Sequence, residues 1–310
     1  MTFLEPFNQT KLYGLGPFLK ELINLEKKNI LPNKIILSGQ KGLGKSTMAF
    51  HLINYILSKD EEYSYDIENF KINSENHSFK TVLNKSNPNL ILIDILSEKK
   101  SIDINQIREL ISKLTKSSFN NKPRFVLIDN IEFLNVNSVN ALLKILEEPS
   151  TNTHYILVHN NKKILSTLLS RCIDFKISLS NKENIIAANQ LLNTDITKII
   201  NKDLLNYYLT PGILYDIYKF GEDNDFDLSD ISLKDFLLKI IKDKHYKKDN
   251  LFKYLIYDFV EFYFSKINLS FQNKVNNQYD YFLKKISDTK KFNLDEESLF
   301  LEFEKKILNG

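Results

Sequence analysis

The segment that most constrains this chain is GQKGLGKST (39–47), which lies between the apolar run KIILS (34–38) and a segment with apolar residues at helical spacing. It matches the pattern G-x-x-x-x-G-K-[ST], in which a glycine-rich turn wraps backbone N–H groups around phosphates. Such a turn binds phosphate where a strand enters it and a helix leaves it. The segment therefore predicts a nucleotide-binding α/β domain, and a chance match in a turn is the alternative.

Each residue type of this turn has a chemical task. Lys45 supplies a positive charge to the outer phosphates, and Ser46 offers a hydroxyl to Mg²⁺. The helix that begins there adds the positive end of its dipole. The predicted nucleotide-binding residues are Gly39, Gly42, Gly44, Lys45, Ser46, Thr47 and Asp129.

Asp129 ends a second apolar run, FVLID (125–129). We predict that it lies beside the phosphate turn and holds Mg²⁺ together with Ser46, directly or through water. The alternative is a strand-end aspartate that only caps the backbone.

Hydrolysis also needs a group that orients and deprotonates the attacking water, and a carboxylate next to the metal-holding aspartate commonly does this. Asn130 occupies that position and is not a base. Loss of a positioned general base lowers a rate by about 10²–10⁴. Glu132 is a candidate replacement, although from a strand it would not project as the neighbour of Asp129 does. We therefore expect binding without efficient turnover.

Strand and helix patterns alternate along the first part of the chain, which predicts a parallel sheet with helical crossovers. The expected strands cover 34–39, 90–94, 125–129, 154–159 and 173–178. The expected helices cover 18–28, 45–57, 77–85, 105–116, 138–148 and 162–169. The rest of the polar stretch 59–89 is expected to be a loop.

Strand patterns stop at about Leu179. Short helices are expected at 181–192, 195–208 and 211–220, and longer ones at 232–244, 250–267, 273–287 and 295–308. Aromatic residues recur there at helical spacing, which indicates a helix-bundle core and is compatible with a subunit interface. They include Phe252, Phe259, Phe262 and Tyr263. We expect three domains: an α/β nucleotide-binding domain (1–178), a small helical lid (179–222) and an all-α C-terminal domain (223–310).

Composition excludes several kinds of site. Cys172 is the only cysteine among the 310 residues, so no internal disulfide and no cysteine-based zinc cluster is possible. The most apolar stretch contains acidic residues and is shorter than a membrane span, and the N-terminus lacks the features of a signal peptide. We expect a reduced, cytoplasmic compartment. The net charge of +3 neither demands nor excludes nucleic acid.

Two further segments carry a more specific resemblance. SVNALLKILEEPS (138–150) and ILSTLLSRC (164–172), behind GQKGLGKST and FVLID, resemble the clamp-loader branch of the AAA+ ATPases, and within it the delta-prime family of bacterial DNA polymerase III subunits. The resemblance covers roughly residues 10–215. It implies a RecA-like P-loop domain, a helical lid, and a C-terminal collar that holds the subunits in a ring. It also implies ATP or ADP with Mg²⁺ as ligands.

The resemblance assigns Ser170, Arg171 and Cys172 to a triplet that supplies an arginine finger. The finger would reach across a subunit interface to the ATP of the neighbour, where a guanidinium can grip phosphate oxygens in bidentate fashion. Such fingers are worth about 10³–10⁵ in rate. The alternative is a surface arginine that stabilises a helix end. Apart from Arg171 the chain has only Arg108 and Arg124 among many lysines, which favours the finger.

Two departures separate the chain from the tau/gamma motor subunit of the same loader. Asn130 replaces the second acid, and the lid segment LTPGILYDI (209–217) places Gly212 where the motor has a sensing arginine. His159 and Asn160 fall where the family has a polar sensor after the fourth strand. His159 could report on a γ-phosphate or simply be solvated.

The resemblance implies tau/gamma and delta subunits as partners, with the sliding clamp and primer-template DNA, which would be held through its backbone inside the assembled ring. No membrane partner is expected. The stretch 59–89 would replace, without zinc, a four-cysteine module that many members carry. The implied role is a structural subunit of the DNA-directed DNA polymerase holoenzyme that helps load the clamp during DNA replication and has little ATPase of its own. Two alternatives stay open: an active ATPase of the tau/gamma type, and a P-loop kinase or GTPase outside replication.

Overall fold

The computed structural model describes residues 4–96, 99–116, 120–150, 152–162, 164–248, 252–268, 275–292 and 294–309. The chain separates into two compact units, one of Met1–Asn193 with Thr210–Gly212 and the other of Thr194–Leu209 with Ile213–Gly310. The expected three-domain division at 178 and 222 stays a prediction. The parts of the expected helices at 163, 250–251 and 273–274 lie outside the described residues.

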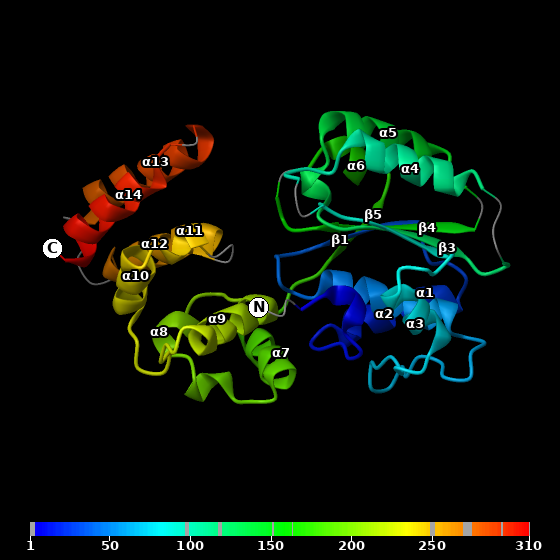
Figure 1. Cartoon of the computed structure of the whole chain (residues 1–310), viewed down its shortest axis with the longest axis horizontal. Helices are drawn as coiled ribbons and strands as arrows, with labels where there is room; N and C mark the ends of the chain where they lie inside the picture. The colour runs from blue at the N-terminus through cyan, green and yellow to red at the C-terminus, as the bar shows by residue number, and fades with distance from the viewer. Residues whose placement is uncertain are drawn as a thin grey trace. The chain divides into compact units, whose positions relative to one another are not determined.

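A five-stranded parallel sheet with the strand order β2-β3-β4-β1-β5 forms the centre of the first unit (Figure 1). The strands are β1 (Lys34–Ser38), β2 (Leu90–Ile93), β3 (Arg124–Ile128), β4 (Thr153–His159) and β5 (Ile173–Lys176). All five expected strands are present, and the last ends at Lys176 rather than at 178. The expected class, an α/β P-loop domain with a parallel sheet and a helical C-terminal part, is confirmed.

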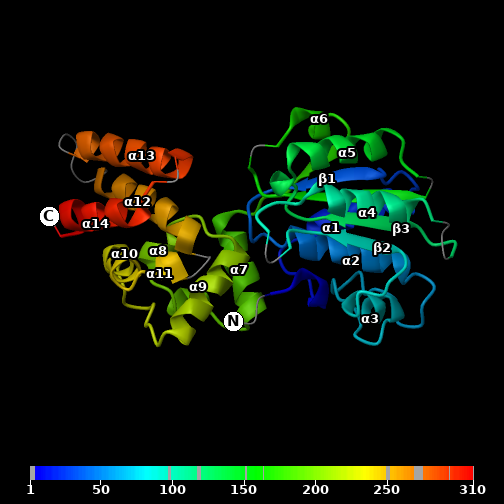
Figure 2. The same ribbon diagram turned by 45° about the horizontal axis from the view of Figure 1, so that its top comes forward.

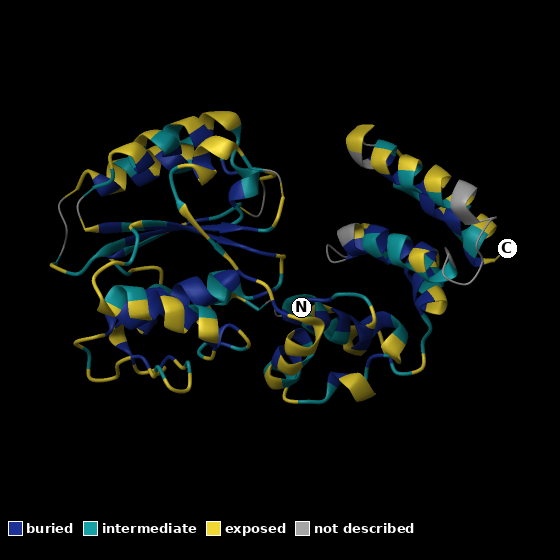
Figure 3. Cartoon of the chain, turned by 180° about the vertical axis from the view of Figure 1, so that it is seen from behind, coloured by how far each residue is buried: buried dark blue, intermediate teal, exposed yellow. Residues whose placement is uncertain are grey.

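Helices cover both faces of this sheet (Figures 1 and 2). One face carries α1 (Gly16–Lys27), α2 (Lys45–Leu57) and α3 (His77–Leu83). The other carries α4 (Ile104–Leu114), α5 (Val136–Glu147) and α6 (Ser166–Leu169). The helices turn buried residues toward the strands and exposed residues toward solvent (Figure 3).

The strands supply both cores because successive side chains of a strand point to opposite faces. In β1, Ile35 and Leu37 join the core under α1 and α2, whereas Ile36 joins the core under α4 and α5. In β3, Leu127 and Ile128 divide in the same way. This two-sided burial explains why the central strands are continuous apolar runs rather than alternating ones.

Side-chain caps fix the starts of α4 and α5. Asp103 and Gln106 form a reciprocal capping box at the start of α4. Asn135 caps α5, which therefore starts at Val136, earlier than the expected 138. α6 is limited to Ser166–Leu169, shorter than the helix expected at 162–169.

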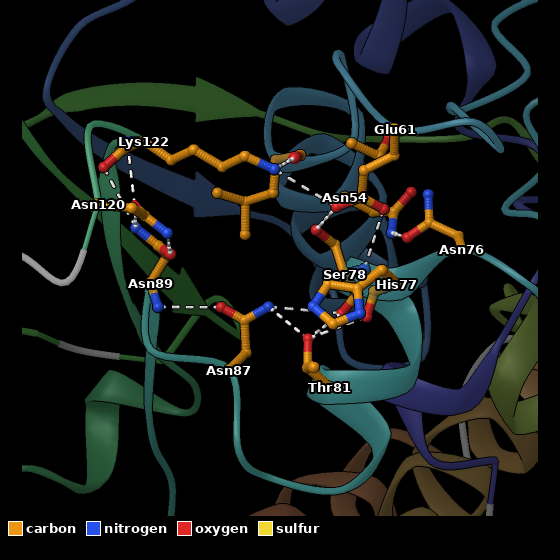
Figure 4. Close-up of polar contacts among 12 residues, drawn as sticks. Asn54, Glu61, Asn76, His77, Ser78, Thr81, Asn87, Asn89, Asn120 and Lys122 are labelled. Carbon is orange, nitrogen blue, oxygen red and sulfur yellow. Dashed lines mark hydrogen bonds and ion pairs between the residues drawn. The ribbon is translucent and has the colours of Figure 1, made fainter.

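Hydrogen bonds between polar side chains hold the stretch 59–89 against the sheet domain (Figure 4). Asn76 caps α3 through the N–H of Phe79 (2.7 Å) and also accepts from Asn54 (3.0 Å). Glu61 accepts the backbone N–H of Ser78 at 3.0 Å. Within the described parts of the chain, no group of three or more His, Cys, Asp or Glu residues could hold a metal ion.

The remaining elements are helical. In the first unit they are η1 (Pro6–Asn8), η2 (Ile131–Phe133) and α7 (Asn181–Leu192). In the second unit they are η3 (Ile196–Lys198), α8 (Lys202–Leu205), most of α9 (Pro211–Asp223), α10 (Leu233–Lys242), α11 (His245–Lys248), α12 (Phe252–Asn268), α13 (Val275–Phe292), α14 (Glu296–Phe303) and η4 (Glu304–Leu308).

Aromatic side chains make up part of the core of the second unit, together with buried leucine and isoleucine side chains. Phe252 and Phe259 are buried, as a helix-bundle core predicts, and Phe236 lies between them with ring centroids 5.8 and 5.7 Å away. Phe262 and Tyr263 are half-buried. No helix among the residues with described structure combines the length and the apolar character that a membrane crossing requires.

Candidate nucleotide-binding site

The predicted site residues meet at the carboxyl edge of the sheet. The phosphate loop (39–44) follows β1, Asp129 follows β3 and Asn160 follows β4. Because β3, β4 and β1 are neighbours in the sheet, these segments emerge side by side. Ligands of open parallel sheets bind at this edge.

The glycines of the phosphate loop are required by its backbone. Gly42 and Gly44 have φ values of 85° and 89°, in the left-handed region that side chains disfavour. A Cβ on Gly39 would lie 2.4 Å from the carbonyl oxygen of Ile177. The loop therefore keeps its backbone bare, as a phosphate cradle requires.

Lys45 is buried with 3% of its surface exposed, and its ammonium group lies among oxygens. Nζ donates to the carbonyl of Gln40 at 2.7 Å and to Oδ1 of Asn160 at 2.9 Å. Burial lowers the pKa of Lys45 to about 8, and the charges of Asp129 and Glu132 oppose this shift. The nearby carboxylates thus do not fully compensate the burial of the Lys45 ammonium group, which lies where the outer phosphates would bind.

Ser46 and Asp129 are in direct contact. The Ser46 hydroxyl donates to Oδ2 of Asp129, and the N–H of Asn130 donates to Oδ1 at 2.8 Å. Burial, with a contribution from the charge of Asp94, raises the pKa of Asp129 to about 6. A buried carboxylate and a hydroxyl that already touch are the oxygen ligands that Mg²⁺ prefers, so these two residues fit the metal. Thr47 is half-buried in the first turn of α2.

Asn130 has a backbone conformation that the sequence did not reveal. Its φ is 55°, in the left-handed region that asparagine tolerates better than most residues. Its side chain donates to Oδ1 of Asp94 at 2.9 Å and accepts from Nδ2 of Asn160 at 2.8 Å. The residue next to Asp129 is therefore an asparagine whose amide nitrogen and amide oxygen are both hydrogen-bonded.

Glu132 lies closer to the site than its sequence position suggested. The expectation assumed a continuing strand, but the chain turns at Asn130 into η2. The Glu132 carboxylate accepts from Nδ2 of Asn160 at 3.0 Å. It also accepts a longer hydrogen bond, of 3.4 Å, from the backbone N–H of Asn160. The turn thus brings the Glu132 carboxylate close to Lys45, with only the side chain of Asn160 bonded to both.

Of the two candidate sensors after β4, Asn160 reaches the site. The His159 ring bonds to the carbonyl of Lys162 and has 8% of its surface exposed. Asn160 instead contacts Lys45, Asn130 and Glu132. The amide therefore connects the lysine to the residues that follow Asp129.

The segment Thr210–Gly212 belongs to the first unit and touches the phosphate loop. The Gly212 N–H donates to the carbonyl of Gly42 at 2.9 Å, and the buried Thr210 hydroxyl donates to the carbonyl of Lys41 at 2.8 Å. A Cβ on Gly212 would lie 2.9 Å from Cα and O of Gly42. The position compared with a sensing arginine thus has no room for a side chain, which the sequence pattern alone did not indicate.

Arg171 follows α6 and makes its polar contacts on α5 and α6. Nε and Nη2 donate to Oε1 of Glu147 at 3.0 and 2.5 Å, and Nη1 donates to the carbonyl of Thr167 at 3.0 Å. One third of the side chain, 33%, is exposed. The neighbouring Ser170 is exposed, whereas Cys172 is half-buried, and burial raises the pKa of its thiol to about 11. The thiol is therefore protonated at neutral pH and is a poor nucleophile.

Comparison with known proteins assigns the chain to a family. The model of the family described as "DNA polymerase III, delta subunit" matches residues 16–181, more than half of the chain. The chain belongs to this family. The match covers the phosphate loop, Asp129 and Arg171, and membership argues against the P-loop kinase or GTPase alternative.

The curated relatives that this chain matches are named as subunits of DNA polymerase III. The delta-prime subunit of Buchnera aphidicola subsp. Baizongia pistaciae is 28% identical over 185 residues, which cover 56% of this chain and 52% of the relative. The delta-prime subunit of Bacillus subtilis is 31% identical over 160 residues, or 50% and 44% of the two chains. The gamma/tau subunit of Mycoplasma genitalium is 27% identical over 239 residues, or 73% and 38%. The chain spans about half the length of the delta-prime relatives that it matches.

Proposed function

We propose that the chain is a delta-prime-like subunit of a clamp loader. It binds ATP or ADP with Mg²⁺, hydrolyses it poorly, and supplies Arg171 to a nucleotide held by the next subunit. The family and the names of the relatives support this role. The single observation that carries the proposal is the combination of an intact phosphate loop with an amide, Asn130, beside Asp129.

The residues of the site divide the work of binding. Backbone N–H groups of the loop and of the first turn of α2 would surround the phosphates, and Lys45 would pair with the outer ones. Ser46 and Asp129 would hold Mg²⁺, which shields phosphate charge when it is bound. A nucleotide also supplies the negative charge that the buried Lys45 lacks, so binding and burial favour each other.

The same site is poorly equipped for hydrolysis. Asn130 cannot accept a proton from water, and its amide is already bonded to Asp94 and Asn160. Gly212 has no side chain with which to contact a terminal phosphate, and the close approach of Gly42 leaves no space for one. Bound ATP would therefore stay largely unhydrolysed and act as a structural ligand.

The exposed apolar residues close to Arg171 in the sequence suit contact with a partner subunit. Leu165, Leu169 and Ile173 flank the arginine in sequence and expose 46%, 41% and 54% of their surfaces. Exposed apolar side chains of this kind are typical of interaction surfaces when they gather in one place. We propose that tau/gamma and delta subunits are the ring partners, and that the assembled ring opens the sliding clamp on primer-template DNA. Cytoplasmic residence with that machinery is part of the same proposal.

Two measurements test the proposal. The isolated chain should bind ATP, detected by titration calorimetry, while it releases phosphate far more slowly than a loader with motor subunits. In a loader reconstituted with its own tau/gamma and delta subunits, Arg171→Ala should lower ATPase about 10³-fold or more at the site that it serves. Unchanged ATPase of that loader would reject the finger.

The second candidate is an active ATPase of the tau/gamma type. Its support is the Glu132 carboxylate, which contacts Asn160 one step from Lys45, and the match to the Mycoplasma genitalium gamma/tau subunit. Steady phosphate release by the isolated chain, lost on both Lys45→Ala and Glu132→Gln, would establish this candidate in place of the first.

A further inference from the structure

Arg171 is held by a carboxylate from another helix. Glu147 is the last residue of α5, and its Oε1 accepts from both Nε and Nη2 of Arg171. Nη1 donates to the carbonyl of Thr167, and a long contact of 3.5 Å reaches Ser170 Oγ. The guanidinium is thus anchored from two helices while a third of the side chain stays exposed.

The carboxylate is placed by a rigid element. α5 packs onto the sheet through Leu142 and Leu146, which are fully buried, and Glu147 follows directly. Exposed ion pairs usually contribute little to the stability of a folded protein, and Glu147 is 52% exposed. Stability is therefore a weak explanation for this pair, whereas control over the direction of a long, flexible arginine is a strong one.

The bonding pattern leaves one edge of the guanidinium for a ligand. Arginine offers a side edge, made by Nε and Nη2, and an end edge, made by Nη1 and Nη2, and either can grip an oxyanion in bidentate fashion. Glu147 occupies the side edge, and the carbonyl of Thr167 accepts one of the two N–H groups of Nη1, so each Nη nitrogen keeps one further N–H. A phosphate that approaches the end edge can therefore be bound without breaking the contact to Glu147.

We infer that Glu147 is a positioning residue for Arg171, and this inference rests on the proposed finger function. Its carboxylate holds the guanidinium by the side edge and presents the end edge to the nucleotide of the neighbouring subunit. The entropy of fixing the side chain is then lost on folding rather than at the moment of catalysis. Glu147 acts through Arg171 and does not itself touch the nucleotide.

The test uses the reconstituted loader with its tau/gamma and delta subunits and ATP, and it compares kcat with KM. Glu147→Ala should lower kcat about two- to fivefold, the effect of losing an exposed ion pair, with KM for ATP unchanged. Glu147→Gln should recover part of the loss, since an amide oxygen still accepts from the guanidinium. The double variant Glu147→Ala with Arg171→Ala should be no slower than Arg171→Ala alone. Glu148→Ala is the matched control, because Glu148 is an exposed glutamate next in the chain, and it should have no effect.

Each other outcome overturns the inference. A faster loader on Glu147→Ala would show that the carboxylate competes with the phosphate, and an unchanged rate would show that it does not position the finger. A double variant slower than Arg171→Ala would show that Glu147 acts by another route. If Arg171→Ala itself has no effect, the proposed function fails first and the inference with it. Equal melting temperatures of the single variants would confirm that the comparison concerns folded proteins.

Discussion

Lys45 and Asn160 are joined by a hydrogen bond of 2.9 Å across 115 positions of the chain. The same amide reaches Asn130 and Glu132, so the residues after β3 and β4 meet at the lysine of the phosphate loop. A terminal phosphate that binds Lys45 must enter next to this amide. The following predictions depend on that arrangement.

Asn160→Ala should lower the affinity for ATP about tenfold more than the affinity for ADP. The amide lies beside Lys45, where the terminal phosphate of ATP would bind, and a hydrogen bond to a charged group contributes about 1.5–3 kcal/mol. Titration calorimetry with both nucleotides measures the difference. Asn161→Gly is the control, since Asn161 is exposed and its φ of 54° suits glycine. Equal losses for ATP and ADP would show that Asn160 does not distinguish the two.

Lys45→Ala should lower affinity for either nucleotide by about 10- to 150-fold, the range expected for a lost charged hydrogen bond. Lys41→Ala removes an exposed lysine from the same loop and should have a much smaller effect. Binding by fluorescence titration decides the matter. Comparable losses from the two variants would mean that general positive charge, rather than Lys45, holds the phosphates.

Asn130→Glu should not create a fast ATPase. The φ of 55° disfavours glutamate by about 1–2 kcal/mol, and the new carboxylate would lie against Asp94 in place of an amide donor. Gly212 still offers no cationic side chain. Steady-state phosphate release should rise by less than about tenfold. A gain of 10² or more, the contribution of a positioned base, would show that the missing acid alone limits turnover.

Gly212→Ala should destabilise the first unit, because its Cβ would lie 2.9 Å from Gly42 and the two backbones would have to separate. Overpacking of this kind costs about 1–3 kcal/mol. Thermal unfolding should show a lower melting temperature, and nucleotide should restore less stability than in the parent chain. A variant with parental melting temperature and affinity would mean that Thr210–Gly212 leaves the loop at no cost.

Nucleotide affinity in the presence of Mg²⁺ should be highest between about pH 6 and pH 8. Metal binding needs the charged form of Asp129, whose pKa is raised to about 6, so affinity should fall as the pH decreases through that value. Phosphate binding needs the charged form of Lys45, whose pKa is lowered to about 8, so affinity should also fall as the pH rises above it. Calorimetry across this range tests both limbs. If affinity stayed constant above about pH 8, and if Lys45→Ala bound nucleotide as tightly as the parent chain, the proposed role of the lysine would be contradicted.

The sequence predicted the sheet domain well because its signals are local. Apolar runs predicted the strands, and the helix expected at 105–116 is α4, whose buried residues Ile107, Leu110 and Leu114 are spaced as on one face of a helix. The phosphate loop and Asp129 could be placed together because parallel strands deliver their carboxyl ends to one edge.

Other features depend on contacts that sequence spacing does not encode. The left-handed backbone of Asn130 turns Glu132 toward Asn160, and nothing in FVLIDNIEFL specifies that turn. The pairing of Arg171 with Glu147 joins residues 24 positions apart. From the sequence, Gly212 could be predicted only as a glycine at the position where the motor subunit has an arginine. The structure adds that its N–H donates to the carbonyl of Gly42.

Amide side chains contribute part of the hydrogen bonding that orders the stretch 59–89, beside the carboxylate of Glu61, which accepts from Ser78. The bonds of Asn54 and Asn76, and of Asn89 and Asn120, join neutral groups that neither titrate nor oxidise (Figure 4). Chelators and shifts in redox potential should therefore leave these two side-chain contacts intact.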